Sequence, residues 1–387
     1  MDKLRVAFFS DTYLPAVDGV VTSMLNFKKE LKKKGHKIFM FVAGDSAAKR
    51  KYQNDDVFIV QGINFKPYPQ YKVAVFPYMS MIKINALDID IIHAQTPFAM
   101  GLAALMSAKI LGKPIIGSYH TLVDNKDIIG SYYPKNKRIR YVAEIAARQY
   151  IKFFYNSCDC VFAPSGTIKR ILEKKGIKNV YIVPNSVDIK RFNPEVSGQN
   201  IRRALKLRNN QKVILYVGRI SREKKLEVLL NAAHALNMKR NDIVFVIGGH
   251  GPALEYYKRM AEKLKLDNLK FVGFIENKKL AEYYAACDVF CIPSTFETQG
   301  MVALEAMACG KPVVGADYLA LKELIKNGKN GEKFKPGSHS ECARKIEKVL
   351  NSSDKYTNCA IDTANEFSLE RTTQRMLDLY NFILSKS

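Results

Sequence analysis

The chain has 387 residues, of which 47% are hydrophobic, and its formal net charge is +24. This length is too great for a single core and fits two domains of ordinary size, with the composition of a soluble globular protein. The charge favours a polyanionic partner, but no zinc-finger, RNP or basic-zipper pattern is present, so we expect no nucleic acid. An anionic membrane surface and a generally lysine-rich surface remain as alternatives.

The seven cysteines are odd in number and stand mostly in apolar segments, which indicates buried thiols in a reducing compartment. No signal peptide is recognised, because residues 5–10 form a short strand-like run. The longest apolar stretch, 98–108, is about half the ~20 residues that a spanning helix needs. We therefore expect a cytoplasmic protein without an integral membrane segment.

Strands and helices alternate from the N-terminus. The apolar run 4–9 predicts a buried parallel strand, 19–34 predicts a helix that ends at Gly35, and 37–43 predicts the next strand. Open α/β sheets bind ligands beyond the carboxyl ends of their strands, so the loop 11–19 is expected at a binding site.

Further strands are expected at 89–93, 114–119 and 160–163, and the alternation restarts at 213–217 and 243–247 before it ends with 288–292 and 312–315. This restart predicts an α/β protein of two doubly wound, Rossmann-like domains. Turn residues in 183–194 mark the junction. We place the first domain at 1–185 and the second at 186–366, followed by a segment 367–387 with a helix at 369–384.

The segment 295–312, TFETQGMVALEAMACGKP, indicates an anion-binding site. Gly300 allows close approach of a ligand, and the free amides of Met301 and Val302 at a helix start direct partial positive charge toward phosphate oxygens. Glu297 and Glu305 are then placed to accept hydrogen bonds from sugar hydroxyls. Alternatively, Glu297 complements the helix dipole and Glu305 is a solvated helix residue.

Two cations follow the expected strand 213–217. Arg219 and Lys224 would lie at its carboxyl end, where fixed cations can stabilise a diphosphate leaving group. In so basic a chain, the alternative is that both cations belong to an ordinary solvated surface.

Asp88 and Asp90 imitate a DxD metal motif, but a lone DxD is a weak signal where a loop enters a strand, and we expect no metal.

The chain resembles the retaining nucleotide-sugar glycosyltransferases of family 4, which have the GT-B fold, over nearly its whole length. Glu297 and Glu305 match the family's E-x7-E signature. The order and spacing of the other short motifs make the resemblance specific. These motifs are SDTYLP at 10–15, DGV at 18–20, IHAQTP at 92–97, SYHT at 118–121, VPNSVD at 183–188, VGR at 217–219 and GGHGP at 248–252.

This resemblance implies two domains that face an interdomain cleft. The first domain is then the acceptor side, the second binds the nucleotide sugar, and the last helix crosses back onto the first domain. In the resembling family two cations bind the diphosphate, so the resemblance assigns Arg219 and Lys224 to it without a metal. It places Glu297 at the donor sugar, Glu305 at the ribose and His120 near the reaction. We interpret Glu297 as suited to front-face return of the acceptor rather than as a nucleophile.

The resemblance assigns further donor contacts. Gly251 lies in a Gly-rich turn that lines the nucleotide pocket, and the backbone at Phe274 and Ile275 reads the base, while Gly19 joins Gly300, Met301 and Val302 in donor binding. The segment 316–323 departs from the pattern, because many relatives carry a Gly-Gly pair before Pro-Glu that is absent here. This departure leaves details of the donor and acceptor open.

Residues 15–20 and 119–121 particularly resemble lipid-modifying members of the family. Two basic segments, 24–34 and 134–154, are candidates for contact with anionic lipid, although packed helices with solvated charged faces would look the same. We therefore expect hexose transfer from a UDP- or GDP-sugar to a lipid or lipid-linked acceptor at the inner face of the cell membrane. A soluble sugar-phosphate or glycan acceptor, and a non-catalytic polyanion-binding protein, are the alternatives.

Overall fold

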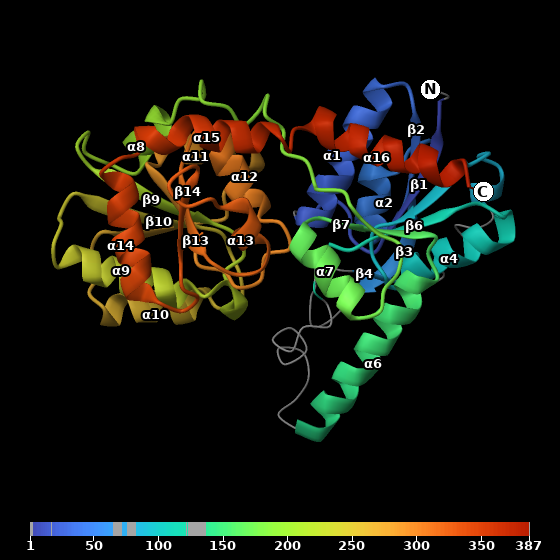
Figure 1. Cartoon of the computed structure of the whole chain (residues 1–387), viewed down its shortest axis with the longest axis horizontal. Coiled ribbons are helices and arrows are strands. Elements are labelled where there is room, and N and C mark those ends of the chain that lie inside the picture. Colours follow the sequence, from blue (N-terminus) through green and yellow to red (C-terminus); the bar gives the residue numbers. More distant parts are fainter. Residues whose placement is uncertain are drawn as a thin grey trace. The chain divides into compact units, whose positions relative to one another are not determined.

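The computed structural model describes residues 3–16, 18–64, 72–75, 83–120, 122 and 137–386, except for the side chains at 137 and 140. The chain divides into two compact units, Met1–Ser186 with Leu369–Ser387, and Val187–Ser368 (Figure 1). Our expected boundaries at 185/186 and 366/367 lie one or two residues away from these. The predicted interdomain cleft stays a prediction, and each unit is described by itself.

The first unit contains an eight-stranded sheet in the order β4-β3-β2-β1-β5-β6-β7-β8. Neighbouring strands are parallel except β3 and β4, which pair antiparallel at one edge. The order reverses direction between β1 and β5. The strands are β1 Arg5–Ser10, β2 Lys37–Gly44, β3 Val57–Asn64, β4 Lys72–Ala74, β5 Ile91–Ala94, β6 Ile115–Ser118, β7 Cys160–Ala163 and β8 Val180–Ile182.

Helices pack against this sheet, and the last helix of the chain is one of them. Met376 and Tyr380 of this helix are fully buried in a core that includes Phe8 and Met40 of the sheet. No described helix has the length and apolarity to cross a membrane. The helices of this unit are α1 Gly19–Lys33, α2 Ser46–Tyr52, α4 Ala99–Leu111, α6 Lys137–Asn156, α7 Gly166–Lys174 and α16 Leu369–Leu384.

The second unit contains a six-stranded, fully parallel sheet in the order β11-β10-β9-β12-β13-β14. This order reverses direction between β9 and β12. The strands are β9 Lys212–Val217, β10 Ile243–Gly248, β11 Leu269–Gly273, β12 Val289–Ile292, β13 Val313–Ala316 and β14 Gly331–Phe334. The helices are α8 Gln199–Ala204, η1 Arg222–Lys224, α9 Leu226–Asn237, α10 Leu254–Lys263, η2 Asn277–Lys279, α11 Leu280–Ala286, α12 Met301–Ala308, α13 Leu319–Leu324, α14 His339–Leu350 and α15 Asp354–Asn365.

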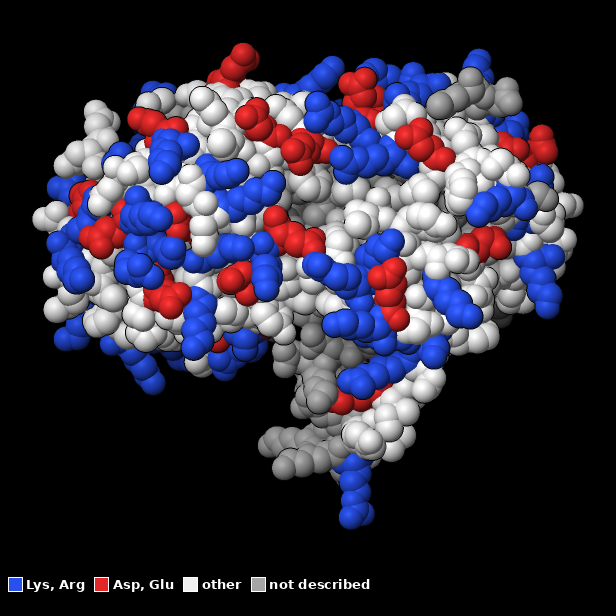
Figure 2. All heavy atoms as spheres, in the orientation of Figure 1, with Lys and Arg blue, Asp and Glu red and all other residues white. Residues whose placement is uncertain are grey.

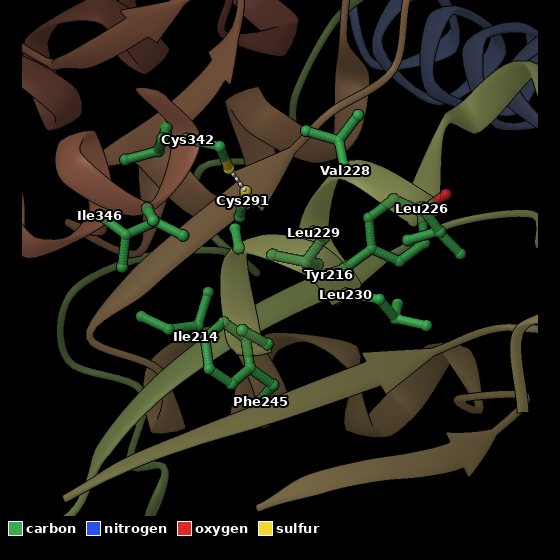
Figure 3. Packing of buried hydrophobic residues seen from close by; sticks show 14 of the residues in the cluster. Ile214, Tyr216, Leu226, Val228, Leu229, Leu230, Phe245, Cys291, Cys342 and Ile346 are labelled. Carbon is green, nitrogen blue, oxygen red and sulfur yellow. Dashed lines mark hydrogen bonds between the residues drawn. The ribbon is translucent and has the colours of Figure 1, made fainter. Parts of the chain in front are cut away.

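Aliphatic side chains from α9 and α14 fill the core of the second unit against the sheet (Figure 3). Cys291 of β12 and Cys342 of α14 point toward each other there, with 3.8 Å between their sulfur atoms. Both are free thiols, and burial raises the pKa of Cys342 well above its usual range. Six of the seven cysteines are buried as free thiols, and Cys359 is exposed.

Candidate active site

Two loops meet at the point where the strand order of the second unit reverses. The first follows β9 and carries Arg219 and Lys224, and the second follows β12 and carries Glu297 and Gly300. β9 and β12 are neighbours in the sheet. In open α/β sheets, such a reversal leaves a crevice beyond the carboxyl ends of the strands, where ligands bind.

Lys224 and Glu297 form an ion pair in which Nζ lies 2.7 Å from Oε1. Their side chains are largely withdrawn from solvent, and 73 residues separate them along the chain. The structure therefore brings together a cation that we expected at the diphosphate and a carboxylate that we expected at the donor sugar. Glu297 is thus not simply an acid that complements a helix dipole.

Arg219 lies in the same loop as Lys224, between β9 and η1. The carbonyl oxygen of Arg219 accepts a hydrogen bond of 3.1 Å from the buried hydroxyl of Tyr216. Burial lowers the pKa of the Arg219 guanidinium, and the nearby carboxylate of Glu223 acts in the opposite direction. An arginine stays charged after a modest shift of this kind, so the loop keeps a partly desolvated cation.

Gly300 precedes α12 with φ +89°, a conformation that favours glycine. A Cβ atom at this position would also lie 2.9 Å from Cδ2 of Leu321. Met301 and Val302 form the first turn of α12, whose amides have no partner within a helix. This end of α12 can therefore donate hydrogen bonds to an anion. The binding of an anion there stays a prediction.

Glu305 is buried one turn further along α12, so the alternative of a solvated helix residue is wrong. The hydroxyl of Tyr284 donates a hydrogen bond of 2.8 Å to Oε2 of Glu305. Burial raises the pKa of Glu305 to about 7, although this hydrogen bond and the charge of Arg191 oppose the rise. A buried carboxylate with one oxygen already satisfied is suited to accept hydrogen bonds from ligand hydroxyls with the other. Its assignment to ribose stays a prediction.

The Gly-rich turn after β10 packs against the loop that carries Arg219. A Cβ atom on Gly249 would lie 1.9 Å from the carbonyl oxygen of Gly218, and one on Gly251 would lie 2.3 Å from that of Ile220. The amide of Ile220 in turn donates a hydrogen bond of 3.0 Å to the carbonyl oxygen of His250. These glycines therefore let two backbones touch, in addition to any contact with a nucleotide.

Phe274 and Ile275, which we expected near the base, follow β11 and lie in different environments. Phe274 is exposed, whereas Ile275 is nearly buried. A Cβ atom on Gly248 would lie 2.3 Å from Cδ1 of Ile275, so the isoleucine side chain fills the space that this glycine leaves. The exposed Phe274 is thus the side chain of the two that is free to meet a ligand.

In the first unit, His120 lies just beyond β6. Its Nε2 is 2.9 Å from Oε1 of Gln95, which follows β5, and burial lowers the pKa of His120 to about 4. The imidazole is therefore neutral at physiological pH, so it acts as a hydrogen-bonding group there rather than as a fixed cation. Sequence reasoning missed Gln95 as a partner, although it lies within the IHAQTP motif.

A second histidine, His93 of β5, is almost fully buried. Its Nδ1 is 2.7 Å from the hydroxyl of Tyr380 in α16, and its Nε2 is 2.7 Å from Oγ of Ser118 in β6. Burial, with a smaller contribution from His120, lowers the pKa of His93 to about 3. His93, Ser118 and His120 line one small pocket with Asn185 and Met376.

Gly19 opens α1 after the loop that follows β1. Asp18 caps this helix, because its Oδ1 accepts a hydrogen bond of 2.9 Å from the amide of Val21, and its Oδ2 accepts one of 2.9 Å from Thr12. No atom lies within 4 Å of the position that a Cβ on Gly19 would take. The open space at Gly19 is compatible with the close approach of a ligand.

Asp88 and Asp90 precede β5. Oδ2 of Asp90 accepts a hydrogen bond of 2.7 Å from the amide of Arg5, so this carboxylate fixes the start of the neighbouring strand β1. Within the described ranges, no three His, Cys, Asp or Glu side chains gather in a way that could hold a metal ion.

The segment 316–323, where the sequence departs from the pattern of the resembling family, contacts the loop of Glu297, because the amide of Ala320 donates a hydrogen bond of 3.3 Å to the carbonyl oxygen of Glu297. Leu319 in this segment has φ +44°, a conformation that favours the glycine it lacks.

Two family models match the two units in turn. The model described as Glycosyltransferase Family 4 matches residues 17–191, and the model described as Glycosyl transferases group 1 matches residues 197–365. A sulfoquinovosyl transferase of Arabidopsis thaliana is 31% identical over 361 residues, which cover 90% of this chain and 67% of that protein. The chain belongs to the family 4 glycosyltransferases.

Other relatives match over most of their length. An alpha-monoglucosyldiacylglycerol synthase of Streptococcus pneumoniae is 29% identical over 384 residues, which cover 97% of this chain and 85% of that protein. A GDP-mannose-dependent alpha-mannosyltransferase of Corynebacterium glutamicum is 29% identical over 332 residues, which cover 85% of this chain and 76% of that protein.

Solved structures with the same fold cover nearly the whole chain. Anabaena HepE in complex with UDP has a TM-score of 0.77 at 20% identity, covering 98% of this chain and 100% of that one. A sucrose-phosphate synthase of Thermosynechococcus elongatus has a TM-score of 0.80 at 19% identity, covering 100% of both chains. The fold predicted from the sequence, GT-B with two Rossmann-like α/β units, is confirmed.

Proposed function

We propose that this glycosyltransferase moves a hexose from a UDP- or GDP-sugar to a lipid or lipid-linked acceptor, with retention of configuration and without a metal ion. The observation that carries the donor half of the proposal is the pair formed by Lys224 and Glu297 where the strand order of the second unit reverses. In this proposal one nucleotide sugar is bound by the cation Lys224, by the carboxylate of Glu297 and by the N-terminal end of α12.

The leaving group is a nucleoside diphosphate, whose negative charge grows as the glycosidic bond breaks. Lys224 and Arg219 would stabilise that charge, and the amides of Met301 and Val302 would bind phosphate oxygens. Fixed cations in this role make a divalent metal unnecessary. His120 and Glu297 are proposed at the donor sugar, and Glu305, Gly19, Gly251, Phe274 and Ile275 at the nucleotide, as the resemblance implied.

The names of the relatives support the acceptor half. Those of Streptococcus pneumoniae and Acholeplasma laidlawii are named for synthesis of a glucosylated diacylglycerol, and one of Mycobacterium tuberculosis for a phosphatidylinositol dimannoside. All three names state an alpha linkage, which retention gives from an alpha-linked donor. The enzyme would then work at the cytoplasmic face of the membrane as a peripheral protein, attracted by its basic charge.

The charge of the first helix is partly used within the unit itself. Lys32 forms an ion pair with Asp56, and Lys33 lies 3.5 Å from Glu30. Figure 2 shows basic side chains spread over both units with acidic ones among them, rather than gathered in one patch on the face that is drawn. Arg138, Arg148 and Lys152 of α6 are exposed and stay candidates for lipid contact. Lys135 lies outside the described residues.

One assay tests the proposal. The protein is incubated with UDP-glucose, UDP-galactose or GDP-mannose and with diacylglycerol in mixed vesicles, and products are identified by mass spectrometry and by the anomeric coupling constant. We expect an alpha-glycolipid with one donor, at the same rate in EDTA. Lys224→Ala should lose about a hundredfold or more in turnover, as is typical when one oxyanion-stabilising group is removed.

A soluble sugar phosphate or glycan as the only acceptor would overturn the proposed lipid acceptor. A beta product would overturn retention, and loss of activity in EDTA that Mn²⁺ restores would overturn metal independence. Binding of donor without any transfer would favour the non-catalytic alternative.

A further inference from the structure

α4 exposes a row of large apolar side chains to solvent, while most of the residues that it buries are small. Its buried residues are Met100, Gly101, Ala103, Ala104, Ser107 and Ala108. Its exposed apolar residues are Phe98 at the N-cap, Leu102, Met106 and Ile110, spaced four residues apart along one side of the helix. We call these four residues the α4 stripe. A surface helix of a globular protein ordinarily turns such large apolar residues inward.

Close packing explains the small residues but not the large ones. A Cβ atom on Gly101 would lie 2.1 Å from the carbonyl oxygen of Thr96 and 2.9 Å from Cζ of Phe154 in α6, so the inner side of α4 has no room for a larger residue at this position. The outer side has no such constraint. Leu102, Met106 and Ile110 nevertheless leave 39%, 53% and 68% of their surface exposed. Polar residues would serve the fold equally well there, so the stripe indicates a surface that something covers.

The charges beside the stripe decide what covers it. α4 contains no acidic residue, and Lys109 is exposed near its C-terminal end, followed by Lys113. α6 lies beside the start of α4, because the hydroxyl of Tyr150 donates to the carbonyl oxygen of Pro97. α6 adds exposed basic residues and the exposed aromatic side chain of Phe153. An apolar strip with basic residues at its rim matches acyl chains below anionic headgroups.

A second copy of the chain fits this surface less well. Two such faces would bring basic residues against basic residues, in a protein whose net charge is already +24. α4 has 13 residues, about 20 Å of helix, which is too short to cross a bilayer but long enough to lie along its surface.

We infer that the α4 stripe lies in a lipid bilayer, with Met106 and Ile110 among the acyl chains and α4 parallel to the membrane plane. The inference rests on the proposed lipid acceptor, and it adds an apolar attachment that salt does not screen to the electrostatic one already proposed. Attachment through the stripe would hold the first unit, the proposed acceptor side, against the membrane that contains the acceptor.

The absence of tryptophan from the whole sequence allows a direct test. Met106→Trp and, as a matched control, Met238→Trp each introduce one reporter at an exposed methionine, and Met238 is 77% exposed in the other unit. Vesicles of phosphatidylcholine and phosphatidylglycerol are added at high salt. We expect a blue shift of tryptophan emission and quenching by brominated acyl chains for Met106→Trp, and neither for Met238→Trp.

Unchanged emission of Met106→Trp while the protein sediments with the vesicles would overturn the inference. A blue shift without lipid, which rises with protein concentration, would overturn it in favour of a second copy.

A double variant separates this inference from the proposed function. Met106→Ser with Ile110→Ser should reduce vesicle binding at high salt by about tenfold or more, because it removes two exposed apolar side chains. UDP binding and the melting temperature should stay as in the wild type, and Met238→Ser should change none of these. Unchanged vesicle binding in the folded double variant would overturn the inference. If the wild type inserts at Met106 but glycosylates only soluble acceptors, the proposed acceptor fails and the inference stands.

Discussion

Lys224 and Glu297 form an ion pair with each other, with 2.7 Å between the ammonium nitrogen and one carboxylate oxygen. Each has a proposed partner on the donor, the diphosphate for Lys224 and the sugar hydroxyls for Glu297. A diphosphate that approaches Lys224 therefore competes with a carboxylate that is already there, so binding of the donor must loosen or share this ion pair.

Replacement of Glu297 by glutamine should separate binding from turnover. The variant removes the competing charge, so UDP should bind about threefold more tightly, the scale of a partly exposed ion pair. Turnover should fall about a hundredfold, because the contact with the reacting sugar is lost. Calorimetric titration with UDP and a transfer assay measure the two effects.

The control for this comparison is Glu255→Gln, which removes the same charge from the exposed end of α10 in the same unit. It should change neither quantity. If Glu297→Gln weakens UDP binding as strongly as Lys224→Ala does, the carboxylate holds Lys224 in place for the diphosphate and does not compete with it.

Glu305 should reduce the stability of the protein at neutral pH. Its folded-state pKa is about 7 and its ordinary value is 4.5, so the folded protein holds this proton more tightly than the unfolded chain does. The contribution of Glu305 to the free energy of unfolding therefore falls as pH rises from 4.5 to about 7, by a total of about 3 kcal/mol. Above that pH the loss is complete and constant.

Glu305→Gln should remove this loss and keep a hydrogen-bond acceptor for Tyr284. The variant should melt at a higher temperature than the wild type at pH 8, the difference should shrink as pH falls toward 4.5, and affinity for UDP should drop at pH 8. Scanning calorimetry across this range, with a UDP titration, measures both. A melting temperature that stays equal to that of the wild type at pH 8 would show that Glu305 is not held at a raised pKa.

The sequence predicted the buried strands well and the partly exposed strands poorly. Continuous apolar runs located β1, β2, β7 and β9 within about one residue, because both faces of these strands are covered. β3 and β4 were not predicted, since exposed and half-exposed residues interrupt β3 and β4 is a three-residue antiparallel edge. The restart of the pattern also predicted the two-unit organisation, while β11 was not predicted and only Phe274 and Ile275 after it were assigned to the base.

Motifs located the loops of the candidate site but not the contacts within it. Arg219, Lys224, Glu297 and Gly300 were each assigned from a short motif, and their loops follow neighbouring strands. The ion pair between Lys224 and Glu297 had no sequence signal, because no local rule couples residues 73 positions apart. The contact of His93 with Tyr380 spans 287 positions and depends on α16 joining the first unit.

Tyr380→Phe should destabilise the first unit selectively. The hydroxyl that it removes satisfies Nδ1 of His93, and a buried polar group left without its partner costs about 1–3 kcal/mol. In scanning calorimetry, the transition that belongs to the first unit should move to a lower temperature. Tyr141→Phe is the matched control, because Tyr141 is exposed on α6 of the same unit and should be neutral. Equal stability of the two variants would mean that His93 finds another partner.

Two glycines assigned to donor binding should respond in opposite ways to alanine. At Gly251 the new Cβ would lie 2.3 Å from the carbonyl oxygen of Ile220, so Gly251→Ala must displace the loop that carries Arg219. We expect a lower melting temperature and UDP binding that is weaker by about tenfold or more, since the displaced loop carries a proposed phosphate ligand.

At Gly19 no atom lies within 4 Å of the new Cβ, so Gly19→Ala should fold normally and gain about 0.5–1 kcal/mol of stability from the lower entropy of the unfolded chain. If a donor approaches the backbone at Gly19, this stable variant should still lose turnover with the full nucleotide sugar. Full activity in Gly19→Ala would remove Gly19 from the donor site and leave it as the first residue of α1.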